Sequence, residues 1–117
     1  MSYRYEAFDT EKRWHRDDDE PAVIMDNGDR YWYKHGKKHR DDDKPAVITA
    51  KGGLGWFQHG LSHRENDKPA IVTPCGGMSW WKNGERWREG DKPHISLSTG
   101  EEYRSMSGMY IETKLAH

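Results

Sequence analysis

Short apolar runs alternate with polar turns along this chain, and the alternation predicts β-hairpins. Pro-Ala-Val-Ile at 21–24 and again at 45–48 is typical of a strand that begins after proline, because β-branched residues favour the pleated conformation. Asp-Asn-Gly-Asp at 26–29 predicts a tight turn, since Asn and Gly adopt positive φ at low cost. Tyr-Trp-Tyr at 31–33 is then the returning strand. No stretch keeps a period near 3.6 residues, so we expect little helix.

The same pattern returns every 24 residues. The step is marked by prolines at Pro21, Pro45, Pro69 and Pro93, and by turn glycines at Gly36, Gly60, Gly84 and Gly108. Such repetition is typical of architectures in which each unit packs on its neighbours. We predict one repeat domain over 1–117, with a partial copy at 1–14, units near 15–38, 39–62, 63–86 and 87–110, and a tail at 111–117. The predicted fold is all-β: tandem 24-residue hairpin repeats that form one elongated, twisted antiparallel sheet.

The second half of each unit predicts a further turn. His35-Gly36, His59-Gly60 and Asn83-Gly84 stand where a two-residue hairpin turn belongs, and Asn-Gly is the strongest such signal. We expect a third short strand carrying the His-Arg pair to follow each turn. An acidic segment, such as Asp-Asp-Asp-Lys at 41–44, then forms the loop that leads to the next proline.

Side chains alternate between the two faces of a strand, which separates two sets of aromatic residues. One face receives Trp32, Trp56 and Trp80, a uniform set that we expect to be core. The other face receives Tyr33, Phe57 and Trp81, followed by Ser105 in the last copy. This second stripe varies in residue type, so we predict that Tyr33, Phe57 and Trp81 bind a partner. The alternative is a second core, covered by curling of the sheet or by a homodimer.

Composition limits the classes of function. Lys and Arg total 19 and Asp and Glu total 20, so the net charge is -1 and gives no general attraction to nucleic acid or anionic membrane. Only 32% of residues are hydrophobic, but six Trp and six Tyr favour a thin aromatic core over disorder. Cys75 is the single cysteine, which excludes an intrachain disulfide and fits a reducing compartment. We expect a cytoplasmic protein with no signal peptide and no membrane span.

The units resemble a known family of repeats. Tyr-Lys-His-Gly-Lys-Lys-His-Arg at 33–40 and Trp-Lys-Asn-Gly-Glu-Arg at 81–86, with the later Asp and Pro-Ala, resemble the MORN-like repeats of bacteriophage and giant-virus proteins. In those repeats the usual form is His-Arg-Glu-Asp-Gly-Pro-Ala; here Lys or Glu precedes the proline where Gly is common. The resemblance implies stacked β-hairpins and an interaction role, and it carries no catalytic residues. It also implies the host-cell cytoplasm as the location if the protein is viral.

One histidine per unit suggests a metal site, but the pattern favours a structural role. His15, His39 and His63 each precede an aspartate by four residues, whereas Trp87 takes the same place in the last full unit. A position that accepts His or Trp is typical of flat packing, and a zinc site needs three or four convergent ligands. We therefore predict no bound metal and no cofactor.

The repeated charges favour structure over catalysis. Arg16, Arg40, Arg64 and Arg88 could contact phosphates, but an aspartate three positions later in each unit favours an ion pair that ties the acidic loop to the strand. Acidic runs such as 17–20 lack the spacing of a calcium-binding loop and fit a solvated loop. Such a ridge could also imitate phosphate towards a partner that binds nucleic acid. No irregular site that would indicate an enzyme interrupts the repeat.

These observations predict a binding protein that is not an enzyme. The hypothesis is a protein-binding repeat module, with a viral protein that binds and inhibits a host defence factor as one instance. The alternative is a single-stranded nucleic-acid-binding protein that uses aromatic stacking and arginine. The salt dependence of binding separates the two, because phosphate contacts give a steep slope.

Overall fold

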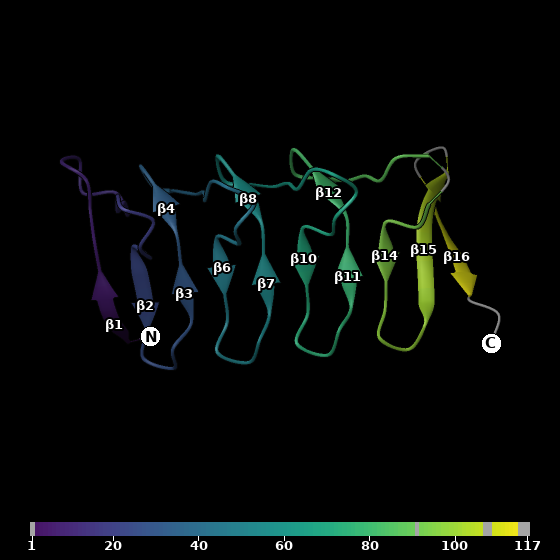
Figure 1. The fold of residues 1–117 in the computed structure, drawn as a ribbon, viewed down its shortest axis with the longest axis horizontal. Coiled ribbons are helices and arrows are strands. Elements are labelled where there is room, and N and C mark those ends of the chain that lie inside the picture. The colour runs from purple at the N-terminus through teal and green to yellow at the C-terminus, as the bar shows by residue number, and fades with distance from the viewer. Residues whose placement is uncertain (1, 91, 107–108, 115–117) are drawn as a thin grey trace.

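The protein is all-β and elongated in its computed structural model, which describes residues 2–90, 92–106 and 109–114, with side chains up to residue 102. The described residues form a ten-stranded antiparallel sheet in the order β1-β2-β3-β6-β7-β10-β11-β14-β15-β16 (Figure 1). Its strands are β1 Tyr3–Glu6, β2 Val23–Met25, β3 Arg30–Tyr31, β6 Val47–Ile48, β7 Leu54–Gly55, β10 Ile71–Val72, β11 Met78–Ser79, β14 Ile95–Ser96, β15 Glu101–Met106 and β16 Met109–Lys114. The prediction of an all-β, elongated antiparallel sheet is confirmed.

Three small hairpins in the described part of the chain lie outside this sheet. They pair β4 Tyr33–Lys34 with β5 Lys37–Lys38, β8 Phe57–Gln58 with β9 Leu61–Ser62, and β12 Trp81–Lys82 with β13 Glu85–Arg86. Figure 1 shows them along one side of the sheet, at the upper ends of its strands, while the turns that join β2 to β3 and β6 to β7 lie at the lower ends. The chain thus alternates between the main sheet and these hairpins. Across the same described residues, no helix is long and apolar enough to cross a membrane.

The two kinds of turn differ in which residues adopt positive φ. In the main-sheet turn only Gly28 does so, at 97°, whereas Asn27 does not and instead accepts the backbone N–H of Asp29 with its side chain. The expectation that Asn27 shares this conformation is therefore wrong. In the small-hairpin turn both residues have positive φ, 47° at His35 and 82° at Gly36, as in a type I′ turn. The following strand ends at Lys38, so His39 and Arg40 lie in the loop and not in a third strand as predicted.

The core is a row of indoles alternating with small residues. Trp32, Trp56 and Trp80 are buried, as predicted, and the alanines Ala22, Ala46 and Ala70 are fully buried. The backbone N–H of Trp56 donates to the carbonyl of Ala70 at 2.7 Å, so the two residues lie side by side. A methyl group beside each indole leaves room for the ring. In the last unit His94 takes the place of the alanine and is also buried.

Arginine and aspartate join each unit to the previous one, which corrects the pairing predicted within a unit. Nε and Nη2 of Arg64 donate to the carboxylate of Asp43, at 2.9 and 3.4 Å, and not to that of Asp67. The guanidinium carbon lies 3.6 Å from the ring centroid of Trp56, whose indole N–H donates to the carbonyl of Asp43. Lys68 adds an ion pair to the same carboxylate at 3.1 Å. The arrangement recurs with Arg40 on Asp19 and Arg88 on Asp67.

Candidate binding site

A groove of about 840 Å³ lies on the sheet face opposite the tryptophan core. The pairing register places Tyr31, Val47, Gly55 and Ile71 in one row across β3, β6, β7 and β10, and paired residues share a face. The row that contains Trp56 lies on the other face, because neighbouring residues of a strand alternate. The groove is lined mainly by apolar groups and is open to solvent.

Two glycines, Gly53 and Gly55, lie in the floor of the groove. Gly55 is buried and stands in the row position that Tyr31 fills one unit earlier and Ser79 one unit later. A Cβ at Gly55 would lie 2.9 Å from Cε1 of Phe57, and one at Gly53 would lie 2.8 Å from the hydroxyl of Thr49. Neighbouring side chains therefore approach the backbone of both glycines closely, and the groove lies above this floor.

The small hairpins supply the wall of the groove. Phe57 of β8 is half-buried and lines it, and so does Lys38 of β5. The ammonium of Lys38 lies 5.0 Å from the ring centroid of Phe57 and 5.9 Å from that of Tyr31, both within range of a cation–π interaction. Burial raises the pKa of Tyr31, and the nearby Asp29 carboxylate adds to the shift, so the phenol stays neutral.

The three aromatic residues predicted to bind a partner do not share this groove. Tyr33 and Trp81 are half-buried like Phe57 but do not line it. The ring of Tyr33 packs 5.1 Å from that of Trp14, and burial raises the pKa of its phenol. The indole N–H of Trp81 donates to the hydroxyl of Ser79 at 2.8 Å. The partner-binding role of the three residues stays a prediction, and Phe57 is the one placed in the groove.

The groove residues that the sequence analysis missed carried a visible signal. Gly53 and Gly55 interrupt the strand pattern where the preceding unit has Asp29 and Tyr31. A glycine inside a strand often marks a place where a ligand or another backbone approaches closely. Comparison of corresponding positions between units would have found both.

The repeated histidines are hydrogen-bonded links between hairpins. Nδ1 of His39 accepts the backbone N–H of His59 at 3.1 Å, while its Nε2 lies 2.8 Å from the carboxylate of Asp41. Because Nδ1 accepts a hydrogen bond, it carries no hydrogen, and Nε2 must be the protonated nitrogen that donates to the carboxylate of Asp41. His15 and His63 make the same contact, to the turn residues His35 and Asn83. The rings of His15 and His35 also stack, with centroids 4.1 Å apart, as expected of a flat packing position. The hydrogen bond adds to that packing and is not available at Trp87, because an indole has no acceptor nitrogen.

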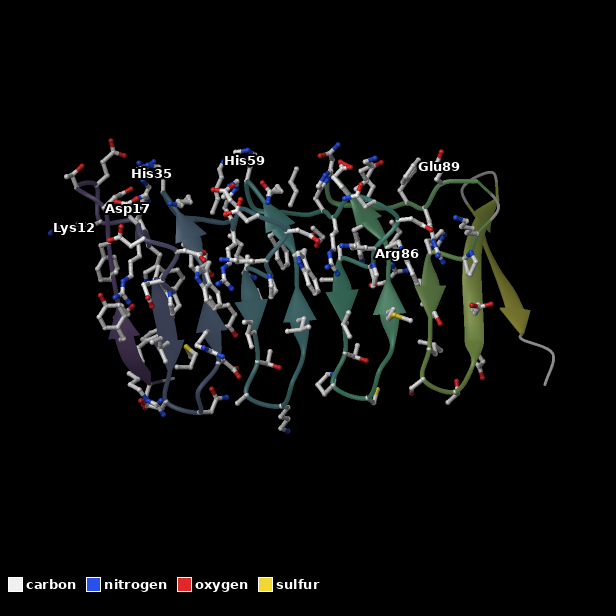
Figure 2. All side chains as sticks on the ribbon, in the orientation of Figure 1. Lys12, Asp17, His35, His59, Arg86 and Glu89 are labelled. Carbon is white, nitrogen blue, oxygen red and sulfur yellow. The ribbon has the colours of Figure 1, made fainter. Side chains whose placement is uncertain are left out.

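The hairpin edge carries most of the paired charges. His35, His59 and Glu89 mark this edge in Figure 2. At its start, the Asp9 carboxylate accepts hydrogen bonds from His35 at 2.8 Å and from Arg13 at 3.0 Å, and the bond from His35 contributes most to a pKa well below the usual range. Within the described residues no three His, Cys, Asp or Glu side chains are grouped to hold a metal ion. Cys75 is exposed, and a hydrogen bond with Thr73 contributes most to lowering the pKa of its thiol.

Comparisons of the chain with protein families, with curated proteins and with solved structures found no match.

Proposed function

We propose that this protein is a binding module that recognises another protein through the groove above Gly55. The observation that carries the proposal is an open apolar groove of about 840 Å³, whose floor includes two glycines, Gly53 and Gly55, that add no side chain to it. A large contiguous apolar patch exposed on a soluble protein often marks an interaction site. A groove open along a sheet face suits a segment of a partner protein better than an enclosed small molecule.

The sheet face that carries the tryptophan core favours protein recognition over nucleic-acid binding, because its aromatic rings are not available for stacking on bases. A single-stranded nucleic-acid binder needs exposed aromatic faces with free arginines beside them. Here the indole of Trp56 is only 8% exposed, and the guanidinium of Arg64 already lies over it while binding Asp43. An enzyme is the least favoured of the three hypotheses. The titratable residues that line the groove are limited to Asp29, Tyr31, Lys38 and Lys51, which offer few groups for catalysis.

Partner capture with a plugged variant tests the proposal. Gly55→Tyr introduces the residue that Tyr31 contributes in the preceding unit, and φ at Gly55 does not lie in the left-handed region. Its Cβ would lie 2.9 Å from Cε1 of Phe57, so the Phe57 ring must move, and we expect a folded protein in which the new ring and the displaced Phe57 fill the groove. Immobilised wild-type protein should retain a partner protein from lysate with or without nuclease, and Gly55→Tyr should lose it. The resemblance to viral repeats makes a host protein the first class of partner to test. Retention that disappears with nuclease would instead support nucleic-acid binding.

A second variant separates the groove from the aromatic stripe. Trp81 lies outside the groove, so Trp81→Ser should keep the partner if the groove is the site, whereas Phe57→Ser should lose it. Loss of the partner in both variants, with both still folded by circular dichroism, would favour the stripe of Tyr33, Phe57 and Trp81. A monomer–dimer change without any change in capture would favour the homodimer alternative.

A further inference from the structure

Two lysines at the groove have no carboxylate partner. Five lysines away from the groove form ion pairs, namely Lys34 with Asp17, Lys44 with Asp19, Lys68 with Asp43, Lys82 with Glu65 and Lys92 with Asp67, whereas Lys12 and Lys37, which also lie away from it, form none among the described residues. Lys38 and Lys51 line the groove, and among the described residues neither lies within 4.0 Å of a carboxylate oxygen. The groove therefore has two positive groups that the described part of the chain does not neutralise.

The one carboxylate that lines the groove is already satisfied. Oδ1 of Asp29 accepts the backbone N–H of Ala50 at 2.7 Å, and its Oδ2 accepts the side-chain amide of Asn27 at 3.2 Å. Both oxygens thus serve the turns at the edge of the sheet. Two ammonium groups against this one carboxylate leave the groove with a net positive charge above an apolar floor. The complement of such a groove is an acidic chain that carries an apolar side chain.

The floor has space for one large side chain. Gly55 adds no side chain to the floor, and Phe57, Val47 and Ile71 surround it, so the groove of about 840 Å³ above them has room for one large side chain. Buried aromatic anchors often contribute most of the binding energy of an interface, and a ring held by Phe57 and Tyr31 would gain aromatic contacts besides burial. An aromatic side chain of a partner therefore fits the hollow in size and chemistry.

The apolar face extends beyond this hollow. A second hollow of about 350 Å³ borders the first at Thr73 and is lined by Ile95 and Leu97, whose exposed fraction is 39%. From β3 to β14 the sheet order has five strand intervals, or about 24 Å at ~4.8 Å each. At ~3.4 Å per residue, an extended peptide of about seven residues would cover that length.

We propose that the groove binds an acidic, extended segment of the partner protein, with one aromatic side chain inserted above Gly55 and its carboxylates paired with Lys38 and Lys51. This inference rests on the proposed function and specifies the chemistry of its partner. It commits to a peptide segment as the occupant, and a second copy of this chain is an outcome of the test.

Selection from a displayed library of random peptides of about 12 residues tests the proposal, because that length exceeds the span of the groove. Wild-type protein should enrich peptides with several Asp or Glu residues around one aromatic residue. A synthetic peptide of the enriched sequence should bind wild-type protein, and Gly55→Tyr should abolish binding while the variant keeps the wild-type circular dichroism spectrum. The double variant Lys38→Glu, Lys51→Glu should weaken binding about tenfold at low salt, and the difference should shrink at high salt.

Lys37→Glu is the matched control, because Lys37 lies in the same strand β5 as Lys38, is exposed, and does not line the groove. It should bind the peptide as tightly as wild-type protein does. Enrichment of basic or uncharged peptides, the absence of any enrichment, or equal binding by Gly55→Tyr would overturn the proposal. So would a wild-type dimer in sedimentation that Gly55→Tyr converts to a monomer, because a second copy would then fill the groove. If a partner protein is still captured through the groove while selected peptides are not acidic, the charge inference fails and the proposed function stands.

Discussion

Arg64 binds the carboxylate of Asp43, which lies 21 residues earlier in the chain, and leaves Asp67, three residues later, to Arg88 of the following unit. Each unit therefore provides an arginine to the unit before it and a carboxylate to the unit after it. The same arginine covers the indole of Trp56 and donates to the carbonyl of Pro69 at 3.2 Å. One side chain thus connects the buried core, the acidic loop and the start of the next strand.

Asp43→Asn should lower stability, because the amide loses the charge that Arg64 and Lys68 share. We expect a cost on the order of 1 kcal/mol or less, since the carboxylate is partly exposed and screened, and added salt should reduce it further. Urea unfolding at low and high salt measures both effects. Asp42→Asn is the control, because Asp42 lies in the same loop with the same sign of φ and is exposed. Equal losses in the two variants would contradict the inter-unit ion pair.

The same pair predicts a dependence on pH. The hydrogen bond from Arg64 contributes most to lowering the pKa of Asp43 below its ordinary 3.8, and Asp67 is lowered to about 2 by Arg88. A depressed pKa adds stability above the unfolded-state value, and this is lost as the pH falls through the folded-state value. Wild-type protein and Asp43→Asn should thus differ most above about pH 4 and converge in stronger acid. A constant difference across that range would contradict the assignment.

Trp56→Ala should destabilise the protein by ~3–5 kcal/mol, because it opens a cavity between Ala46 and Ala70 and leaves the guanidinium of Arg64 without its ring. The measurement is the urea midpoint of unfolding. Trp87→Ala provides the comparison, since the Trp87 side chain is 48% exposed and should cost much less. Similar midpoints for the two variants would show that Trp56 does not lie in the core.

His39 and His63 should carry their ring proton on Nε2, because Nδ1 accepts a backbone N–H in both residues. Nitrogen-15 chemical shifts of the imidazoles at neutral pH report the tautomer directly. His59 serves as a comparison within the same protein, because its ring is exposed. A proton on Nδ1 of His39 would rule out the bond to the backbone of His59.

His94 should make folding sensitive to mildly acidic pH. Burial contributes most to lowering its pKa from the ordinary 6.5, so the folded protein holds it neutral while the unfolded chain takes up a proton near that value. Stability should therefore fall as the pH drops below about 6.5. His94→Ala restores the alanine of the other units and should reduce this slope in urea titrations between about pH 5 and pH 7. Equal slopes for the two proteins would contradict a buried neutral imidazole.

The local chemistry of the chain predicted the strands and turns well. The dipeptides His35-Gly36 and Asn83-Gly84 both form turns with positive φ at each residue, because local backbone sterics decide that conformation. The burial of Trp56 also followed from its recurrence in a strand pattern of period two. The sequence did not predict that the third strand ends before His39. The side chain of His39 accepts a hydrogen bond from the backbone N–H of His59, in a hairpin 20 residues away, and that contact depends on the tertiary structure.

The sequence by itself determined the period, the strand class and the two turn positions, since each depends on residues that are neighbours in the chain. Only the tertiary structure decided which unit each charge pairs with, because Arg64 reaches Asp43 through the stacking of successive units and not through the shorter path along the backbone. The same holds for the groove. Phe57 from a small hairpin and Ile71 from the next unit lie beside Gly55 only in the folded protein. The groove is therefore formed by residues that are distant in the chain.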